Sequence, residues 1–355
     1  MSLVRTTPPR PVEVTTVFPE LAPLARPALR LHPRPGLPSV RDSSVGGPLL
    51  WPAEEPWPHC EDAHLHVDTG FRRSPTEVRL RRRLSRWCPE GQTPTLTSEE
   101  EALEERNAAW LAERLEAGPP GPAECPVPML PVAQLYLRDV PLLQPPGQAD
   151  LLQILWCPYE HDPHYKPATA LFWRSAAEVG DVLATPPEPY EADYPGYVPE
   201  QCVLAPEAIT DYPNLLDLSP ELRLVLGDWS RWQAAGADVD SSYAEDPHEF
   251  YMTHLGQAPG WKVGGWPPWG RTDPNPRYCA VCEAQMIPLL TIASFESNGD
   301  ESLSWVPQED QAAASSDCAH QDVSQPTRVE VGSTDNMQIY VCPTSPQHPH
   351  TDLIQ

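Results

Sequence analysis

The residues with the most definite chemistry are three cysteines and a histidine near the end of the chain. Cys279 and Cys282 form a CxxC pair, and Cys342 and His348 follow, giving the spacing C-x2-C-x59-C-x5-H. A CxxC at a turn lets two thiolates reach one tetrahedral zinc ion at about 2.3 Å, and a third Cys with a His completes such a site. The spacing therefore predicts a zinc site formed by Cys279, Cys282, Cys342 and His348.

Several alternatives stay open for this region. His350 could supply the fourth ligand in place of His348, and Cys318 with His320 could compete for the later pair. The thiols could also be ordinary reduced cysteines. A redox dithiol is the weakest interpretation, because that chemistry usually places CxxC at a helix N-terminus, whereas here prolines precede the pair and an apolar run follows it.

No catalytic signature is found elsewhere in the sequence. It contains no GxSxG, no Walker loop and no GxGxxG, so neither a nucleophile elbow nor a phosphate-binding loop is expected. His161-Asp162 and the stretch 246–249 hold acid–base residue types, but such residues occur in any chain of this length. His64 and His66 share a face if they lie on a strand, a spacing that is more often incidental than metal-binding. No catalytic residue is predicted.

Tryptophans gather near the two Gly-Gly turns of the sequence. Trp and Tyr at half-exposed positions dominate binding hot spots, because they bury a large area at low entropic cost. We expect some of these side chains to line a groove between two halves of the molecule; alternatively, each fixes a proline-rich loop onto a sheet. The candidate binding residues are Trp51, Trp57, Trp261, Trp266, Trp269 and Trp305.

The elements that must position these residues occur twice. Three blocks of the sequence recur in the same order, which indicates an internal duplication. The matched blocks are Val45-Gly46-Gly47-Pro48 with Val263-Gly264-Gly265-Trp266-Pro267, 129–135 with 286–292, and 153–158 with 338–343. The apolar runs within them, bounded by Pro and Gly, are typical of strands. We therefore expect an α+β fold of mostly antiparallel, roll-like β structure with a few peripheral helices.

The expected organisation has three parts. Residues 1–40 form an extended, Pro-rich N-terminal arm laid over the surface. Residues 41–205 form the first repeat, with an inserted helix at 98–117 that starts at a capping box and ends at a Gly-Pro run. Residues 206–355 form the second repeat, which carries the CxxC and an acidic loop at 296–331.

Composition limits the partners and the compartment. The 355 residues carry a net charge of −26, which repels nucleic acid and anionic membranes and favours a neutral or basic protein partner. Nine cysteines, without a secretory signal or an apolar run long enough to cross a membrane, indicate a reducing, cytoplasmic location. The 48 prolines favour short strands and extended connectors over long helices.

Several of these segments together resemble the bacterial YwqG-like family, in its long actinobacterial form. They are LHPRPG at 31–36, SSVGGPLLWPAEEPWPHC at 43–60, QILWCPYEHD at 153–162, the KVGGWPPW segment and the CAVC motif. The resemblance covers about residues 30–350 and implies a β-rich roll with an internal duplication. It implies no catalytic residues, because the family has no established activity. Where related sequences end with a second Cys-rich knuckle, this one reads CPTSPQHPH.

The sequence favours a non-enzymatic binding or adaptor protein, monomeric or homodimeric. It would recognise a protein or peptide partner through an aromatic and Pro-rich cleft between two pseudo-symmetric halves. A specific form of this hypothesis is an immunity- or antitoxin-like protein that neutralises a basic toxin. The alternatives are a zinc-dependent enzyme of unknown reaction and a structural component of a larger assembly.

Overall fold

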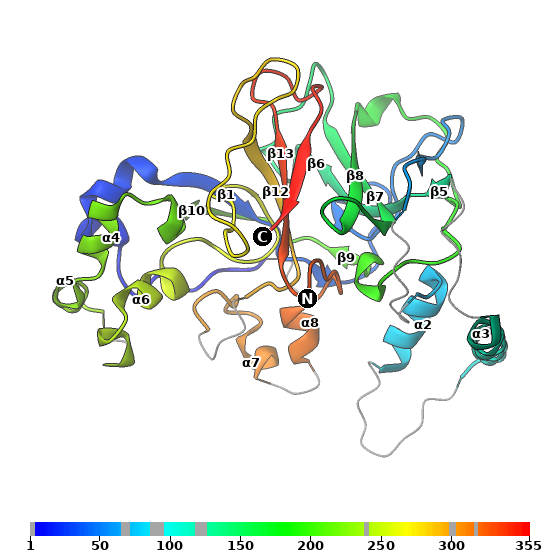
Figure 1. Ribbon diagram of the computed structural model, residues 1–355, viewed down its shortest axis with the longest axis horizontal. Coiled ribbons are helices and arrows are strands. Elements are labelled where there is room, and N and C mark those ends of the chain that lie inside the picture. Colours follow the sequence, from blue (N-terminus) through cyan, green and yellow to red (C-terminus); the bar gives the residue numbers. More distant parts are fainter. Residues whose placement is uncertain are drawn as a thin grey trace.

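The computed structural model describes residues 4–64, 72–85, 96–117, 126–237, 241–297, 303–315 and 319–355. It confirms an α+β fold dominated by antiparallel sheets, with the helices at the periphery (Figure 1). No helix among these residues is long and apolar enough to cross a membrane.

Two six-stranded antiparallel sheets form the body of the molecule. Sheet A has the order β10 (Glu207–Asp211), β1 (Arg26–Arg30), β11 (Lys262–Gly264), β12 (Ile287–Ala293), β13 (Asn336–Val341) and β14 (Thr351–Ile354). Sheet B has the order β2 (Arg34–Pro35), β9 (Cys202–Val203), β3 (Ser44–Val45), β6 (Leu130–Tyr136), β7 (Leu151–His161) and β8 (Lys166–Arg174). A small third sheet pairs β4 (His59–Cys60) with β5 (Val127–Pro128).

The two sheets are built on the same plan. Each of the pairs β6–β7 and β12–β13 has six matched positions, which run from Leu130↔Trp156 to Tyr136↔Leu151 and from Ile287↔Val341 to Ala293↔Asn336. Both pairs have a register shift immediately after a proline, Pro131 in one and Pro288 in the other. Proline has no N–H for the ladder, so it is tolerated at such an irregularity. The internal duplication therefore extends to the register of the strands.

The turns that follow β3 and β11 also correspond. Gly46 and Gly264 have φ of 62° and 73°, a region that L side chains rarely adopt. A Cβ at Gly46 would lie 2.6 Å from the carbonyl oxygen of Glu200. The first glycine of each Gly-Gly pair is thus required by the backbone conformation in each half.

Two extended segments cross between the sheets. Residues 26–35 supply β1 to sheet A and β2 to sheet B, whereas residues 202–211 supply β9 to sheet B and β10 to sheet A. The segments are antiparallel to each other, with Arg26 opposite Asp211, Arg30 opposite Glu207 and Arg34 opposite Val203. β1, from the first half of the chain, pairs with β11 of sheet A, and β9, from the second half, pairs with β3 of sheet B. Each sheet therefore contains a strand from the other half of the chain. The expected extended arm is only partly extended: residues 14–24 form the short helices α1 and η1, and residues 26–35 lie within the sheets. In the strand order, β1 and β9 occupy corresponding places in the two halves.

One core is shared by both sheets. Its largest buried side chain from sheet B is Trp156, whose Nε1 donates to the carbonyl oxygen of Tyr197 at 2.8 Å. Strands β6, β7, β12 and β13 are apolar on successive residues because side chains cover both of their faces. The buried members from the two sheets include Leu130, Val132, Ile154, Val263, Leu290, Ile292 and Ile339.

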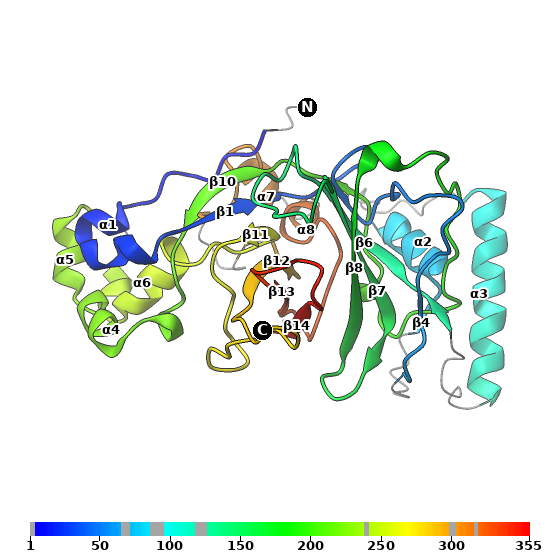
Figure 2. The same cartoon turned by 90° about the horizontal axis from the view of Figure 1, so that it is seen from above.

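Helices occupy the two ends of the long axis (Figure 2). One end packs around Phe18, Trp232 and Phe250, and it contains α1 (Val14–Val17), η1 (Pro19–Leu24), α4 (Pro220–Leu226), α5 (Trp229–Ala234) and α6 (Pro247–His254). The other end carries α2 (Pro75–Ser85) and α3 (Ser98–Ala117), the latter with the predicted bounds. The remaining helices are α7 (Gln311–Ala314), α8 (His320–Ser324), η2 (Ala176–Glu178), η3 (Pro195–Tyr197), η4 (Leu215–Asp217) and η5 (Ser241–Ala244).

Candidate functional site

The structure brings together the four residues whose spacing predicts a metal site, here called the second-half cluster (Cys279, Cys282, Cys342 and His348). A bridge between Tyr278 and Gln285 closes the turn that carries the CxxC. Cys342 directly follows β13, whose pairing with β12 brings it next to that turn. The sheet therefore aligns two segments that lie far apart in the sequence.

Two of the distances within the second-half cluster are close to those of a tetrahedral site. Cys282 Sγ lies 3.4 Å from Cys342 Sγ, and Cys279 Sγ lies 3.4 Å from His348 Nδ1. All four ligand atoms lie within 4.8 Å of one another. Zinc–sulfur bonds of about 2.3 Å and zinc–nitrogen bonds of about 2.0 Å at tetrahedral angles separate neighbouring ligand atoms by about 3.6 Å. A metal ion can be bound here with only small side-chain movements.

The electrostatics favour a thiolate at Cys342. At the neighbouring Cys282, a backbone hydrogen bond at Ala284 lowers the pKa, but the hydrogen bond with Cys342 contributes to a net rise. Burial raises the pKa of Cys342, but hydrogen bonds from the backbone at Ser345 and Thr344 outweigh it and lower this pKa to about 6. The backbone N–H of Val281 donates to Cys279 Sγ at 3.4 Å. Because metals bind the thiolate, both features prepare the cluster for a cation.

The competing ligands lie elsewhere or outside the described residues. His350 Nε2 contacts Thr169 Oγ1 at 2.8 Å instead of joining the cluster. His320 Nδ1 contacts the carbonyl oxygen of Ala314. Cys318 and His66 lie outside the described residues. A role for Cys318 in the later ligand pair and a metal site with His64 and His66 therefore stay alternatives.

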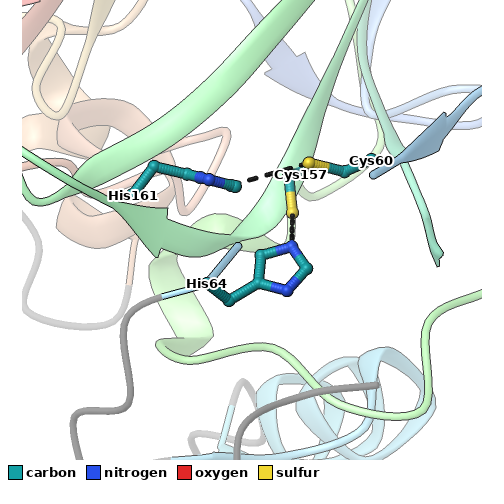
Figure 3. A group of neighbouring side chains, drawn as sticks. All are labelled: Cys60, His64, Cys157 and His161. Atoms are coloured by element: carbon teal, nitrogen blue, oxygen red, sulfur yellow. Dashed lines mark hydrogen bonds between the residues drawn. The ribbon is translucent and has the colours of Figure 1, made fainter. Parts of the chain in front are cut away.

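A second group of metal-binding side chains lies in the other half (Figure 3). This first-half cluster consists of Cys60, His64, Cys157 and His161, with all four ligand atoms within 4.8 Å of one another. Cys157 Sγ lies 3.3 Å from His64 Nε2, and Cys60 Sγ lies 3.8 Å from His161 Nε2. A hydrogen bond from Cys157 lowers the pKa of Cys60 far below its usual value, aided by His161. The spacing of its residues does not predict this group, although the repeat that matches 153–158 with 338–343 makes Cys157 the counterpart of Cys342.

The six candidate tryptophans act mainly as anchors of loops. Trp51, Trp57, Trp261 and Trp305 are buried, and Trp266 and Trp269 are half-buried. Each indole N–H donates a hydrogen bond within the protein. The carbonyl acceptors are Glu55 for Trp51, Met129 for Trp57, Ala293 for Trp261, Thr253 for Trp305 and Leu24 for Trp266, and the carboxylate of Asp217 accepts from Trp269. Burial raises the pKa of Asp217 to about 6 despite its bond to Trp269. The four buried rings hold proline-rich loops onto the sheets and offer no surface to a partner, because core side chains surround them.

A groove between the halves is lined by other residues. This inter-half groove has a volume of about 960 Å³ and lies between residues 169–174 of β8 and residues 346–350, which lead into β14. Phe172 and Trp173 line it from one half, and Pro346, Pro349 and His348 line it from the other. Proline and aromatic side chains therefore line a groove between the halves, but none of the six candidate tryptophans is among its lining residues.

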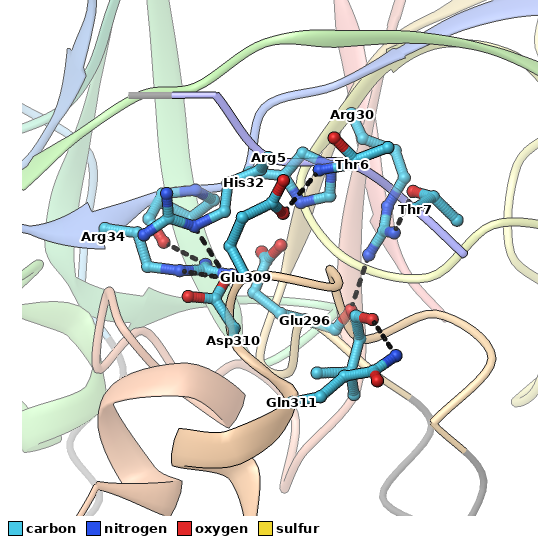
Figure 4. A network of polar contacts seen from close by, with 12 residues as sticks. Arg5, Thr6, Thr7, Arg30, His32, Arg34, Glu296, Glu309, Asp310 and Gln311 are labelled. Carbon is cyan, nitrogen blue, oxygen red and sulfur yellow. Dashed lines mark hydrogen bonds and ion pairs between the residues drawn. The ribbon is translucent and has the colours of Figure 1, made fainter. Parts of the chain in front are cut away.

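A network of buried charges holds the N-terminal segment and the loop after β12 against the crossing strands (Figure 4). Arg30 is buried and donates to the carbonyl oxygens of Trp305 and Glu296, both at 2.9 Å. Burial lowers the pKa of Arg30 to about 10, so it remains charged at neutral pH. Arg5 and Arg34 both bind Asp310. These charges are paired within the protein, so the network is best explained as a link between segments.

Comparisons with known proteins add no family to this description. No protein-family model matches the chain, and no curated protein matches it. The resemblance to the YwqG-like family therefore stays a prediction.

Proposed function

We propose that the protein is a non-enzymatic binding protein that holds an extended segment of a partner protein in the inter-half groove. The observation that carries the proposal is the groove itself, which places an edge strand of one half opposite a proline-rich loop of the other. Its volume of about 960 Å³ lies at the upper end of the roughly 300–1,000 Å³ of small-molecule sites.

Strand β8 is suited to receive such a segment. It pairs with β7 along one edge, and its other edge pairs with no strand among the described residues. The main-chain groups of an unpaired edge bind an extended peptide by adding a strand, and pockets for alternate side chains then supply specificity. The aromatic rings of Phe172 and Trp173 lie on this strand and are half-buried at the groove.

The charge of the protein favours a basic partner. A net charge of −26 attracts a cationic chain over long distances and accelerates its encounter with the groove. An immunity- or antitoxin-like role, in which this acidic body neutralises a basic protein, is the specific form of the proposal.

Zinc is the metal we propose for the second-half cluster. Three Cys and one His supply the four ligands of a tetrahedral zinc ion, which leaves no position open for a substrate, so the ion would be structural. His348 is both a ligand and part of the groove wall. The metal would therefore fix the loop 346–350 and keep the groove in shape for binding.

A peptide-display selection with the full chain tests the binding proposal. We expect enriched peptides to combine Lys or Arg with alternating apolar residues. Gln148 and Gln347 are exposed at the groove, so a Gln148→Arg, Gln347→Arg variant should repel and obstruct such peptides and weaken binding at least tenfold. Gln233→Arg, at an exposed position on α5, is the matched control and should bind normally. Equal binding by all three proteins would refute the proposal.

A zinc-dependent enzyme is the second candidate, and one observation favours it. Cys282 is exposed and His348 lines the groove, so solvent can approach the metal position from both. Catalysis would require one ligand to be replaced by water. X-ray absorption spectroscopy of zinc-loaded Cys157→Ser protein, in which only the second-half cluster keeps all four of its ligands, distinguishes the two. Three sulfurs and one nitrogen support a structural ion, and an oxygen in place of one of them supports an enzyme.

A further inference from the structure

We propose that the first-half cluster is a second structural zinc site, equivalent to the second-half cluster by the internal duplication, so that one chain binds two zinc ions. Cys60, His64, Cys157 and His161 would hold the ion as a Cys2His2 site. This site is separate from the groove and does not depend on what the groove binds.

The geometry of the first-half cluster meets the requirements of zinc. The sulfur–nitrogen separations of 3.3 Å and 3.8 Å bracket the value of about 3.6 Å expected around a tetrahedral zinc ion. Cys60 and Cys157 are buried, while His64 and His161 lie at or near the edge of the buried region, so the ion would have a largely dry but reachable position. Two thiolates and two neutral imidazoles also balance the charge of Zn²⁺, which stabilises an ion with little solvent around it.

The strand register places the later ligand pair at matching positions. Trp156 lies opposite Leu130 at the end of the β6–β7 match, and Val341 lies opposite Ile287 at the end of the β12–β13 match. Cys157 and Cys342 are the next residues in each case. His161 then follows Cys157 within β7, as His348 follows Cys342 in the loop before β14.

The earlier ligand pair matches in the same way. The backbone N–H of Met129 donates to the carbonyl oxygen of Pro58 at 3.0 Å, and that of Met286 donates to the carbonyl oxygen of Arg277 at 2.8 Å. Cys60 lies two residues after Pro58, and Cys279 lies two residues after Arg277. His64 then takes the role of Cys282.

The two sites differ in what they enclose. In the second half a short turn connects the CxxC to β12. In the first half, α2 and α3 are inserted in the sequence between His64 and β5, which pairs with β4. A metal bound to Cys60 and His64 at the start of this insertion, and to Cys157 and His161 on β7, would fix the base of the insertion to sheet B. The donor set of thiolate and imidazole suits zinc and does not suit the oxygen-seeking ions calcium and magnesium.

Native mass spectrometry and elemental analysis of the full chain, purified without an affinity tag, test the proposal. We expect two zinc ions per chain. Cys157→Ser should retain one, and Cys342→Ser should also retain one. Cys202→Ser changes a buried cysteine outside both clusters, so this control should retain two.

A His161→Cys variant keeps the proposal testable if Cys157→Ser does not fold. It should still bind two metal ions and, with cobalt in place of zinc, should show stronger thiolate-to-metal absorption because a third thiolate joins the site. One zinc in the natural sequence, with cobalt spectra that His161→Cys leaves unchanged, would overturn the proposal. Iron with inorganic sulfide in place of a second zinc would overturn it as well.

Discussion

The stability contributed by metal at the second-half cluster can be calculated from the distance along the chain. A metal ion that binds both Cys279 and Cys342 closes a loop between residues 63 positions apart in the sequence. The chain-entropy relation for cross-links gives about 4 kcal/mol for a loop of this length. That is a large share of the roughly 5–15 kcal/mol by which a typical native protein is stable. A Cys342→Ser, His348→Gln variant, which keeps only the CxxC ligands, should therefore lose about 4 kcal/mol.

Urea unfolding in excess zinc, followed by tryptophan fluorescence, measures this loss. The matched control is Cys202→Ser, which makes the same sulfur-to-oxygen change at a buried cysteine that donates to the carbonyl oxygen of Pro326. The difference in unfolding free energy between the variant and the control isolates the effect of the metal. If the variant has lost its zinc by elemental analysis and is as stable as the control, the loop-closure reasoning is wrong.

Three further substitutions test sheet A and the segment 26–35 that crosses between the sheets. Asp211→Asn should lower the free energy of unfolding by about 3–5 kcal/mol, because it leaves the buried ammonium of Lys262 without its counter-ion. A decrease below about 1 kcal/mol in chemical denaturation would contradict the importance of this ion pair. Burial lowers the pKa of His32 to about 4, so as pH falls the unfolded chain is protonated at this imidazole before the folded protein is. The free energy of unfolding should therefore fall by about 3 kcal/mol as pH drops from about 6.5 to about 4. Denaturation at several pH values should show a smaller decrease in unfolding free energy for His32→Asn. Gly265→Ala should cost about 1–3 kcal/mol by calorimetry because φ is 70° and Asp211 crowds the position, whereas Gly180→Ala, with no heavy atom within 4 Å, should be nearly neutral.

Local signals in the sequence predicted the elements that depend on neighbours along the chain. Helix α3 has the predicted bounds because a capping box and a Gly-Pro run define its two ends. The ligands of the second-half cluster could be selected by spacing because the CxxC is itself local, and the duplication then pointed to Cys342.

Features that depend on distant pairing could not be predicted in this way. The N-terminal segment was expected to lie extended over the surface because it is rich in proline. Instead, residues 14–24 form short helices, and Leu29 and Leu31 are buried by strands about 180 and 230 positions away. The tryptophans were expected at a cleft because they flank turns, but burial of a large ring depends on which loop covers it. The first-half cluster was missed because the insertion of α2 and α3 separates Cys60 and His64 from the strand that carries Cys157.

The crossing of residues 26–35 and 202–211 means that neither half contains all of its own strands. If the chain were cut before β9, the N-terminal fragment would carry sheet B without β9, which lies between β2 and β3. The C-terminal fragment would carry sheet A without β1. The arrangement is that of an intertwined homodimer whose two subunits have become one polypeptide. A fragment carrying one repeat would meet its missing strand only in another copy, so such fragments should associate rather than fold alone, and a gene split at this point should yield two chains that function only when they are produced together.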